Sequence, residues 1–333
     1  MNSFDFICVS GYGKSGSGAC VDLLKEFEYI GGLDKEFRMT KDPSGILDLE
    51  SSLVENWEFV RHNIAIRDFL EYCFMLSRKD GIFKRVGKNY NDMLGVDFMA
   101  ESLLYVEKLS DFIYYGDSLL NRYRLTATQS FRQRVRSKLG LDNSIQTYFS
   151  RPTKERFLLE TKKYLKSIFM NYANNMDLQK VVLDQAVSPI NIHKNLKYFC
   201  DAKMIIVDRD PRDIYTTMVN EKRLLGADYS HNKSPNKYIV WHKYVRSKLD
   251  NDNINQEKVL RLNFEDFFIN YNKTIEKIKD FLDIDFEHKY KGERFNPDDM
   301  DKYVGIWKKN QDQESMSYIE KSLSEYCFYD CRR

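Results

Sequence analysis

The chain opens with Phe6-Ile-Cys-Val-Ser-Gly-Tyr-Gly-Lys-Ser-Gly-Ser-Gly-Ala-Cys-Val-Asp-Leu-Leu24, two apolar runs joined by a glycine-rich segment. The first run, residues 3–9, predicts a β-strand, and the apolar spacing of the second predicts a helix over residues 19–27. Glycines stand between them at positions 11, 13, 16 and 18. Backbone N–H groups at a helix N-terminus bind anions, and glycine lets the anion approach closely. The stretch therefore predicts a phosphate-binding loop, to which Lys14 adds a positive charge.

The loop differs from the ATP-binding P-loop by one defining residue. That motif reads G-x-x-x-x-G-K-[ST]. Gly13-Lys14-Ser15 supplies its end, but Cys8 occupies the position of the first glycine. The polar groups follow the lysine instead, which suits a single terminal phosphate-like group. The alternative is a glycine-rich turn between strand and helix that binds nothing.

Further short apolar runs, each followed by a helical pattern, predict an α/β fold with a P-loop-type parallel sheet flanked by helices. The expected strands are residues 29–33, 180–184, 202–208 and 258–262, and the expected helices are residues 189–198, 211–225 and 264–282. Residues 49–76, 93–120 and 155–176 also show helical spacing, with no strand expected near them. We expect one domain over residues 1–333, with residues 42–178 as a large helical insertion.

Composition excludes several classes of protein. A net charge of +2 over 333 residues does not indicate a nucleic-acid binder. No apolar run reaches the ~18 residues of a membrane span, and the first strand begins too close to Met1 for a leader peptide. The six cysteines contain no C-x-x-C pair, which favours reduced thiols. We therefore expect a soluble cytoplasmic protein without a transmembrane segment.

A second charged stretch follows the apolar run that ends at Asp208. Arg209-Asp-Pro-Arg-Asp213 lies at the expected carboxyl end of that strand, where ligands of parallel sheets bind. Thr217 comes about two helical turns after Arg209. An arginine fork and a hydroxyl group can bind phosphate oxygens together. Asp208 alone also resembles a metal-binding Walker B residue, and the arginines and aspartates could instead pair among themselves.

These two stretches together resemble the signatures of the sulfotransferases that use 3′-phosphoadenosine 5′-phosphosulfate (PAPS). Gly13-Lys-Ser-Gly-Ser17 resembles the family's Pro-Lys-Ser-Gly-Thr loop, and Arg209–Asp213 resembles its Arg-Asp-Pro-Arg-Asp element. Weaker matches are Val259–Phe267, Ile278–Ile284 and Val304–Lys308. The family's proline is Gly13 here, and its Arg-Lys-Gly triplet is not intact, with Lys302 nearby. The resemblance covers residues 4–39 and about 180–326, and we expect a carbohydrate sulfotransferase of the heparan type from a bacterium.

The resemblance implies roles for particular residues. The family transfers the sulfuryl group of PAPS to an acceptor and leaves 3′-phosphoadenosine 5′-phosphate (PAP), without a metal ion. The 5′-phosphosulfate would be held by the loop residues Gly13, Lys14, Ser15, Gly16, Ser17 and Gly18. Arg209 and Thr217 would hold the 3′-phosphate, with Lys302 as a further contact. Lys14 would stabilise the charge that develops on the leaving group.

Transfer to a hydroxyl group also needs a base. Lys35-Glu36-Phe37-Arg38 resembles the Lys-Glu-x-His segment of the heparan-type enzymes, whose glutamate is the base. We therefore select Glu36, although it could be only an exposed loop carboxylate. His62 and Asp184 are the alternatives, because cytosolic members use a histidine and Asp184 ends a strand at the same sheet edge. A lone histidine among apolar helix positions is more often a packing residue.

The resemblance does not cover the insertion, residues 42–178, and we expect this region to recognise the acceptor. The insertion contains a basic run, which consists of Arg122, Arg124, Arg132, Arg134, Arg136, Lys138, Arg151, Lys154 and Arg156. It is either a solvated segment or a positive rim for an anionic acceptor such as an acidic saccharide. We expect an acceptor hydroxyl on a carbohydrate or glycolipid, and no nucleic-acid partner. The rival functions are a P-loop kinase or NTPase with Mg²⁺ on Asp208, and a nucleotide- or glycan-binding protein without catalysis.

Overall fold

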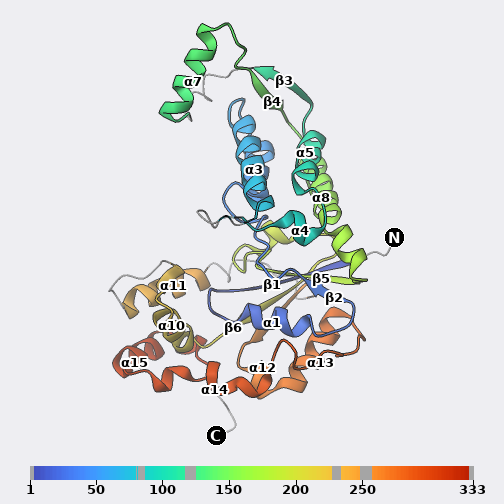
Figure 1. The fold of residues 1–333 in the computed structure, drawn as a ribbon. Helices are drawn as coiled ribbons and strands as arrows, with labels where there is room; N and C mark the ends of the chain where they lie inside the picture. Colours follow the sequence, from blue (N-terminus) through green and yellow to red (C-terminus); the bar gives the residue numbers. More distant parts are fainter. Residues whose placement is uncertain are drawn as a thin grey trace. The chain divides into compact units, whose positions relative to one another are not determined.

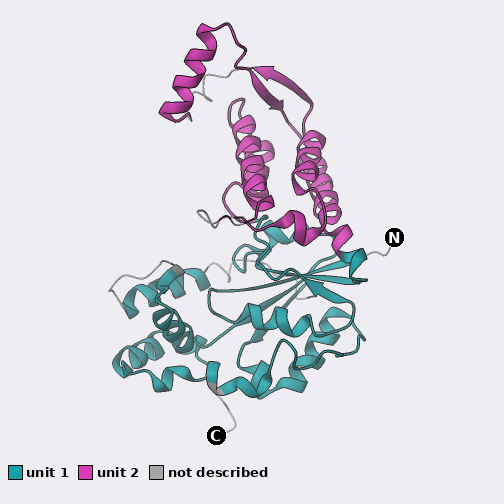
Figure 2. Cartoon of the chain, in the orientation of Figure 1, with its two compact units in different colours: residues 1–40, 173–333 teal, residues 41–172 magenta. Residues whose placement is uncertain are grey.

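The computed structural model describes residues 4–79, 81, 87–116, 125–226, 234–247 and 257–329. The chain divides into two compact units, Met1–Thr40 with Ala173–Arg333 and Lys41–Tyr172 (Figure 2). The first unit is α/β, and the second falls almost entirely within the residues expected to form the insertion. In the described part of the chain, none of the helices combines the length and the apolar character that a bilayer crossing needs.

The first unit is built on a five-stranded parallel sheet with the order β2-β5-β1-β6-β7 (Figure 1). The strands are β1 (Asp5–Gly11), β2 (Ile30–Gly32), β5 (Lys180–Asp184), β6 (Lys203–Asp208) and β7 (Val259–Asn263). Each lies where the sequence predicts a strand, within two residues at either end. Because β1 is central, its carboxyl end and the glycine loop lie between the ends of β5 and β6.

Both faces of the sheet are covered. Ile7 and Val9 pack on one face against Leu23, Phe267 and Ile278. That face carries α1 (Ser17–Leu24), α12 (Asp266–Ile269) and α13 (Tyr271–Leu282) (Figure 1). The alternate residues of β1 are also fully buried, as expected for a parallel sheet covered on both sides.

A second apolar cluster lies beside the sheet. It joins α10 (Pro211–Asn220), α11 (Pro235–Ser247) and α15 (Gln313–Ser322) through buried side chains that include Ile214, Tyr238 and Ile319. Smaller elements of this unit are α9 (Ile192–Leu196), α14 (Met300–Tyr303) and 3₁₀ helices at Leu224–Gly226, Pro297–Asp299, Ile306–Lys309 and Ser324–Tyr326. The prediction that Pro189 opens a helix is wrong, because α9 starts at Ile192. Pro211 does occupy the first turn of α10.

The second unit contains strands that the sequence did not predict. β3 (Phe112–Gly116) and β4 (Ile145–Phe149) form an antiparallel pair. The described helices of this unit are α2 (Ile46–Glu50), α3 (Arg61–Ser77), α4 (Tyr90–Leu94), α5 (Phe98–Leu109), α7 (Ala127–Lys138) and α8 (Lys154–Asn175). A π-helix (Ser51–Glu55) continues α2, and the last residues of α8 belong to the first unit. The expectation of an all-helical segment is therefore wrong. Residues of β3 are largely exposed on both faces, so no alternation marks the strand.

A buried carboxylate fastens the C-terminal part of the first unit to the end of α1. Glu26 is fully buried, and its Oε1 accepts hydrogen bonds from the N–H groups of Gly292, Arg294 and Phe295 at 2.8–3.1 Å. Its Oε2 lies 2.8 Å from His288 Nε2. Burial alone raises the pKa of Glu26, but these hydrogen bonds outweigh it and hold the pKa below its usual value.

We expect Glu26→Gln to lower the free energy of unfolding by about 1–3 kcal/mol at neutral pH, the range for an imperfectly satisfied buried group. A carboxylate with a lowered folded pKa stabilises the fold above its unfolded pKa of about 4.3 and loses that contribution as pH falls further. Urea unfolding at neutral pH and near pH 3.5 should therefore show a smaller difference at the lower pH. Glu28→Gln, which removes a surface ion pair with Lys289, is the control and should cost under about 0.5 kcal/mol. Equal costs for the two variants would contradict this role.

Candidate active site

The loop between β1 and α1 has a backbone that requires glycine. Gly13, Lys14 and Gly16 have left-handed φ values of 47°, 62° and 94°. A Cβ atom on Gly16 would lie 2.1 Å from Cδ2 of Phe264. The loop therefore turns tightly against the residue that follows β7, and its amides lie at the N-terminus of α1.

Ser15 holds the loop together from inside. Its Oγ donates to the carbonyl oxygen of Val207 at 2.7 Å and accepts from the N–H of Tyr12 at 2.9 Å. Ser15 is 1% exposed. The hydroxyl of Ser15 is therefore used within the loop, and its backbone N–H is the group that remains for a phosphate. The hydroxyl of Ser17 is held by Gln185 Nε2 at 3.0 Å, a contact that the sequence did not predict.

Arg209 joins the loop to the C-terminal segment. It donates to the carbonyl oxygen of Lys14 at 2.9 Å and to that of Tyr303 at 2.6 Å, and its guanidinium lies 4.8 Å from the centre of the Phe264 ring. Burial lowers the pKa of Arg209, while nearby acidic groups such as Asp213 act in the opposite sense. A guanidinium has five N–H groups, so these two bonds leave donors for a ligand.

One cavity of about 700 Å³ collects most of the predicted site residues. Those that line it are Lys14, Gly16, Ser17, Gly18, Glu36, Asp184, Arg209, Thr217 and Lys302. Gly13 and Ser15 belong to the same loop but are not part of its lining. The residues come from the carboxyl ends of β1, β2, β5 and β6 or the loops that follow them, and from α1, α10 and α14, as expected for a ligand site at the edge of a parallel sheet.

Thr217 and Lys302 have partners within the chain. Thr217 Oγ1 donates to the carbonyl oxygen of Asp213 one turn earlier in α10, at 2.8 Å. Lys302 forms an exposed ion pair with Asp299 at 2.6 Å. An exposed pair of this kind is weak, so Lys302 can exchange Asp299 for an anionic ligand.

The ammonium group of Lys14 is paired with Glu221, at the C-terminal end of α10. Both side chains are partly exposed and line the cavity. Sequence reasoning did not find Glu221, because it lies in the charged segment Asn220–Lys222 without a motif. A bound anion would therefore compete with Glu221 for the ammonium group of Lys14.

Aromatic rings form another wall that sequence reasoning did not find. Phe264, Phe268, Phe295 and Tyr303 line the cavity, and the rings of Phe268 and Tyr303 are 6.1 Å apart between centres. Flat rings of this kind can stack on a planar base. Phe264 and Phe267 were noted in the sequence only as part of a strand-to-helix match, and Arg294, which also lines the cavity, was not noted.

Glu36 is held over the sheet edge by its neighbour. The N–H of Phe37 donates to the carbonyl oxygen of Asp184 at 2.9 Å, and the Phe37 ring is fully buried. The Glu36 carboxylate is about half exposed and lies 3.6 Å from Arg38. Glu36 and Asp184 therefore both face the same cavity.

His62 belongs to the second unit and is buried there. Its ring nitrogens lie 3.1 Å from the carbonyl oxygens of Glu58 and Tyr148, and its ring stacks on Trp57 with centres 5.3 Å apart. These contacts favour the packing role that a lone histidine on an apolar helix face usually has.

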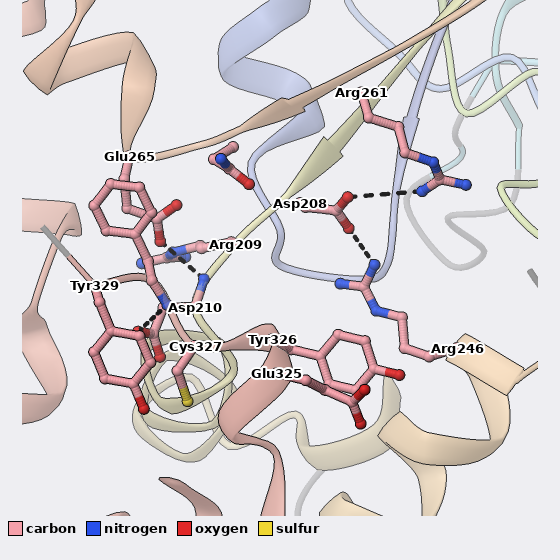
Figure 3. Close-up of a pocket in the computed structure, with 12 residues that line it drawn as sticks. Asp208, Arg209, Asp210, Arg246, Arg261, Glu265, Glu325, Tyr326, Cys327 and Tyr329 are labelled. Atoms are coloured by element: carbon pink, nitrogen blue, oxygen red, sulfur yellow. Dashed lines mark hydrogen bonds and ion pairs between the residues drawn. The ribbon is translucent and has the colours of Figure 1, made fainter. Parts of the chain in front are cut away.

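A second cavity, of about 600 Å³, also has Arg209 in its lining (Figure 3). There Arg246 from α11 and Arg261 from β7 point at the carboxylate of Asp208, and Arg261 lies 3.7 Å from it. The Arg246 guanidinium lies 3.9 Å from the centre of the Tyr12 ring, and Arg261 donates to the Tyr12 hydroxyl at 3.2 Å. The carboxylate that resembles a Walker B residue is thus paired with two arginines that support the glycine loop.

Glu265 completes the wall of this second cavity. It accepts a hydrogen bond from the N–H of Asp210 at 2.8 Å, and burial raises the pKa of Glu265 to about 8. The carboxyl group is therefore largely protonated at neutral pH, which lowers the cost of its burial.

The central strand of the parallel sheet ends in a glycine-rich loop, and an arginine that follows the neighbouring strand donates a hydrogen bond to that loop. These features define a P-loop-type α/β protein that binds phosphate groups. The chain belongs to the sulfotransferase family, because the model of that family matches residues 104–288, more than half of the sequence. The predictions of the PAPS-dependent sulfotransferase family and of the fold class are confirmed, while the carbohydrate type and the bacterial source stay predictions.

Solved structures with a similar fold include two sulfotransferase domains. The domain from the curacin biosynthetic pathway is 12% identical, with 97% of this chain and 98% of that chain covered and a TM-score of 0.46. The domain from the Synechococcus PCC 7002 olefin synthase is 14% identical, with 99% and 98% covered and a TM-score of 0.41. A retinol dehydratase in complex with androsterone and PAP is 14% identical, with 98% and 82% covered and a TM-score of 0.35. A search of curated proteins gives no match.

The geometry of Gly16 predicts a loss of stability on substitution. Gly16→Ala places a methyl group against Phe264 at a left-handed φ, and we expect it to cost about 1–3 kcal/mol of unfolding free energy. Gly18→Ala is the matched control, because its Cβ meets nothing within 4 Å. It should be neutral or slightly stabilising, as alanine is favoured over glycine in a helix. Chemical denaturation of both variants tests this, and similar effects would show that the loop does not pack as described.

Proposed function

We propose that this PAPS-dependent sulfotransferase transfers the sulfuryl group to a hydroxyl group of a carbohydrate or glycolipid. The transfer reaction is supported by one observation: the lysine of the glycine loop, groups that can bind anions, a candidate base and an aromatic wall line a single cavity. The carbohydrate or glycolipid acceptor follows from the likeness of the Glu36 segment to the heparan-type enzymes. A screen of hydroxyl acceptors with labelled PAPS tests it, and label on non-carbohydrate acceptors alone would overturn the acceptor class.

The residues present suit each part of PAPS. Backbone N–H groups from Ser15 to Gly18 at the start of α1 suit the 5′-phosphosulfate. Arg209, Thr217 and Lys302 offer donors and charge for the 3′-phosphate. The rings of Phe268 and Tyr303 suit the adenine base.

PAPS supplies a sulfuryl group activated by its bond to a phosphate. Lys14 would exchange Glu221 for the leaving group and neutralise the negative charge that develops on its bridging oxygen. Glu36 would accept the proton of the attacking hydroxyl, with Asp184 as the second candidate. Glu221 would hold the ammonium group of Lys14 beside the loop until the donor replaces it.

The kinase alternative is less well supported by the residues. Cys8 replaces the first glycine of the ATP motif, and the Asp208 carboxylate already has two arginine partners. A protein that only binds nucleotides would not need a carboxylate over the cavity, so substitution of Glu36 separates that alternative from catalysis.

We also propose a cytoplasmic location without a nucleic-acid partner. Cys200 and Cys327 are partly exposed free thiols, which fits a reducing compartment.

We expect Lys14→Ala to lower kcat by ~10²–10³, the size of one lost transition-state donor. The control is Lys289→Ala, which removes a lysine that forms a surface pair and should leave kcat unchanged. Turnover of labelled PAPS measures both. Near-normal turnover by Lys14→Ala would remove Lys14 from the mechanism.

Glu36→Gln should lower kcat by ~10²–10⁴, the usual contribution of a general base. PAP should still raise the melting temperature of the variant, because Glu36 is not assigned to the donor. Asp184→Asn is the companion variant. Full activity in Glu36→Gln together with a loss in Asp184→Asn would assign the base to Asp184, and full activity in both would contradict a carboxylate base.

A further inference from the structure

Helix α7 of the second unit presents an apolar stripe to solvent. Phe131, Val135 and Leu139, just past its end, are 70%, 40% and 69% exposed. Residues four apart share one face of a helix. Every residue of α7 is exposed or half-exposed, so α7 contributes nothing to a core. Such a stripe is unusual for a helix that is fixed in a folded unit.

Positive charges border the stripe on both sides. Residues 127–138 contain four basic side chains and no acidic one. At about 100° per residue, Arg134 and Lys138 lie on one side of the stripe, and Arg132 and Arg136 lie on the other. Long basic side chains beside an apolar face can reach outward to anionic groups while their stems cover apolar surface.

The polar side of α7 is the side that contacts the segment after the helix. The Asn143 side chain donates to the carbonyl oxygen of Gln133 at 3.2 Å and to Ser137 Oγ at 2.7 Å. Gln133 and Ser137 lie opposite the apolar stripe on the helix. The start of α7 is fixed by a capping box between Thr126 and Gln129. The fold thus holds the helix by its polar face and leaves the apolar face outside.

The neighbouring strand exposes aromatic side chains as well. Tyr114 and Tyr115 of β3 are 40% and 72% exposed. Tyrosine is favoured at membrane–water interfaces, where its ring is buried and its hydroxyl is hydrated. We name β3, α7 and β4 together the arm.

We propose that the arm docks on an anionic lipid membrane surface, with the apolar stripe of α7 inserted at the headgroup level. An exposed apolar stripe bordered by lysine and arginine is the pattern of helices that lie in a membrane interface. The proposal is independent of the sulfuryl-transfer function, since it concerns the second unit alone.

Other occupants fit the arm less well. A second copy of α7 would bring four further positive charges against the four already present, and like charges repel. An acidic saccharide would pair with the arginines but would leave Phe131 and Leu139 in water. The basic run therefore divides into parts. Arg156 is paired with Asp111 at 2.9 Å, and Arg122 and Arg124 lie outside the described residues. Among the cations beside the stripe, Arg136 donates to Asn143 Oδ1 and to the carbonyl oxygen of Asp142, whereas Arg132, Arg134 and Lys138 are exposed.

The test is flotation of the full-length protein with vesicles of phosphatidylcholine alone or with about a third of phosphatidylglycerol. We expect binding to the anionic vesicles that weakens from about 0.1 M to about 1 M salt, as the Debye length falls from about 10 Å to about 3 Å. Phe131→Ser/Leu139→Ser should weaken binding at least about tenfold, through the loss of apolar burial. Arg134→Glu/Lys138→Glu should weaken it about 25-fold or more, because each basic residue near the surface contributes about fivefold.

Val240→Ser is the matched control, because Val240 is 67% exposed on α11 of the other unit and should leave vesicle binding unchanged. All variants should keep the rise in melting temperature with PAP, which shows that they fold and separates this result from any failure of the proposed function. Absence of wild-type binding, or equal binding by wild type and both arm variants, would overturn the proposal. A dimer that the arm variants dissociate, seen by light scattering without vesicles, would assign the surface to a second copy instead.

Discussion

The arrangement of the site depends on the guanidinium group of Arg209. It bonds the carbonyl oxygens of Lys14 and Tyr303, which come from the two ends of the chain, and it lies over the ring of Phe264. A neutral side chain at this position would leave two carbonyl groups without these bonds, at about 1–3 kcal/mol each if they stay buried. Because Arg209 follows β6 directly, the parallel pairing of β1 with β6 fixes where this bridge forms.

The charged side chains next to the glycine loop stabilise its conformation. Asp208 ends β6 in the position of a metal-binding aspartate, yet Arg246 and Arg261 neutralise it and also hold Tyr12 of the loop (Figure 3). Arg246 from α11 and Arg261 from β7 therefore both support the loop through Tyr12.

Sequence patterns predicted the parts of the site that depend on a local motif or on the repeated succession of strand and helix. Short apolar runs followed by helical spacing located the five strands, and the carboxyl ends of parallel strands meet at one edge, which brought Lys14, Asp184 and Arg209 together. Glu221 and the ring of Tyr303 carry no local signal, because their place in the cavity depends on packing between segments far apart in the chain. The hydroxyl of Ser15 shows the same limit, since only the structure reveals that it donates a hydrogen bond to the carbonyl oxygen of Val207. β3 and β4 were missed because their partners are distant in sequence and their faces lack alternation.

The central claim concerns two groups of residues that can donate hydrogen bonds to anions, the glycine loop and the pair Arg209 and Thr217. Both groups line one cavity, and we propose that they bind the two ends of one PAPS molecule. Isothermal titration calorimetry with PAP and with adenosine 5′-phosphate, both without magnesium, tests it most directly. A 3′-phosphate that gains charge-assisted hydrogen bonds worth about 1.5–3 kcal/mol should make PAP bind about 10- to 150-fold more tightly. Equal affinities for the two nucleotides, or tight binding only of ATP with magnesium, would contradict the account.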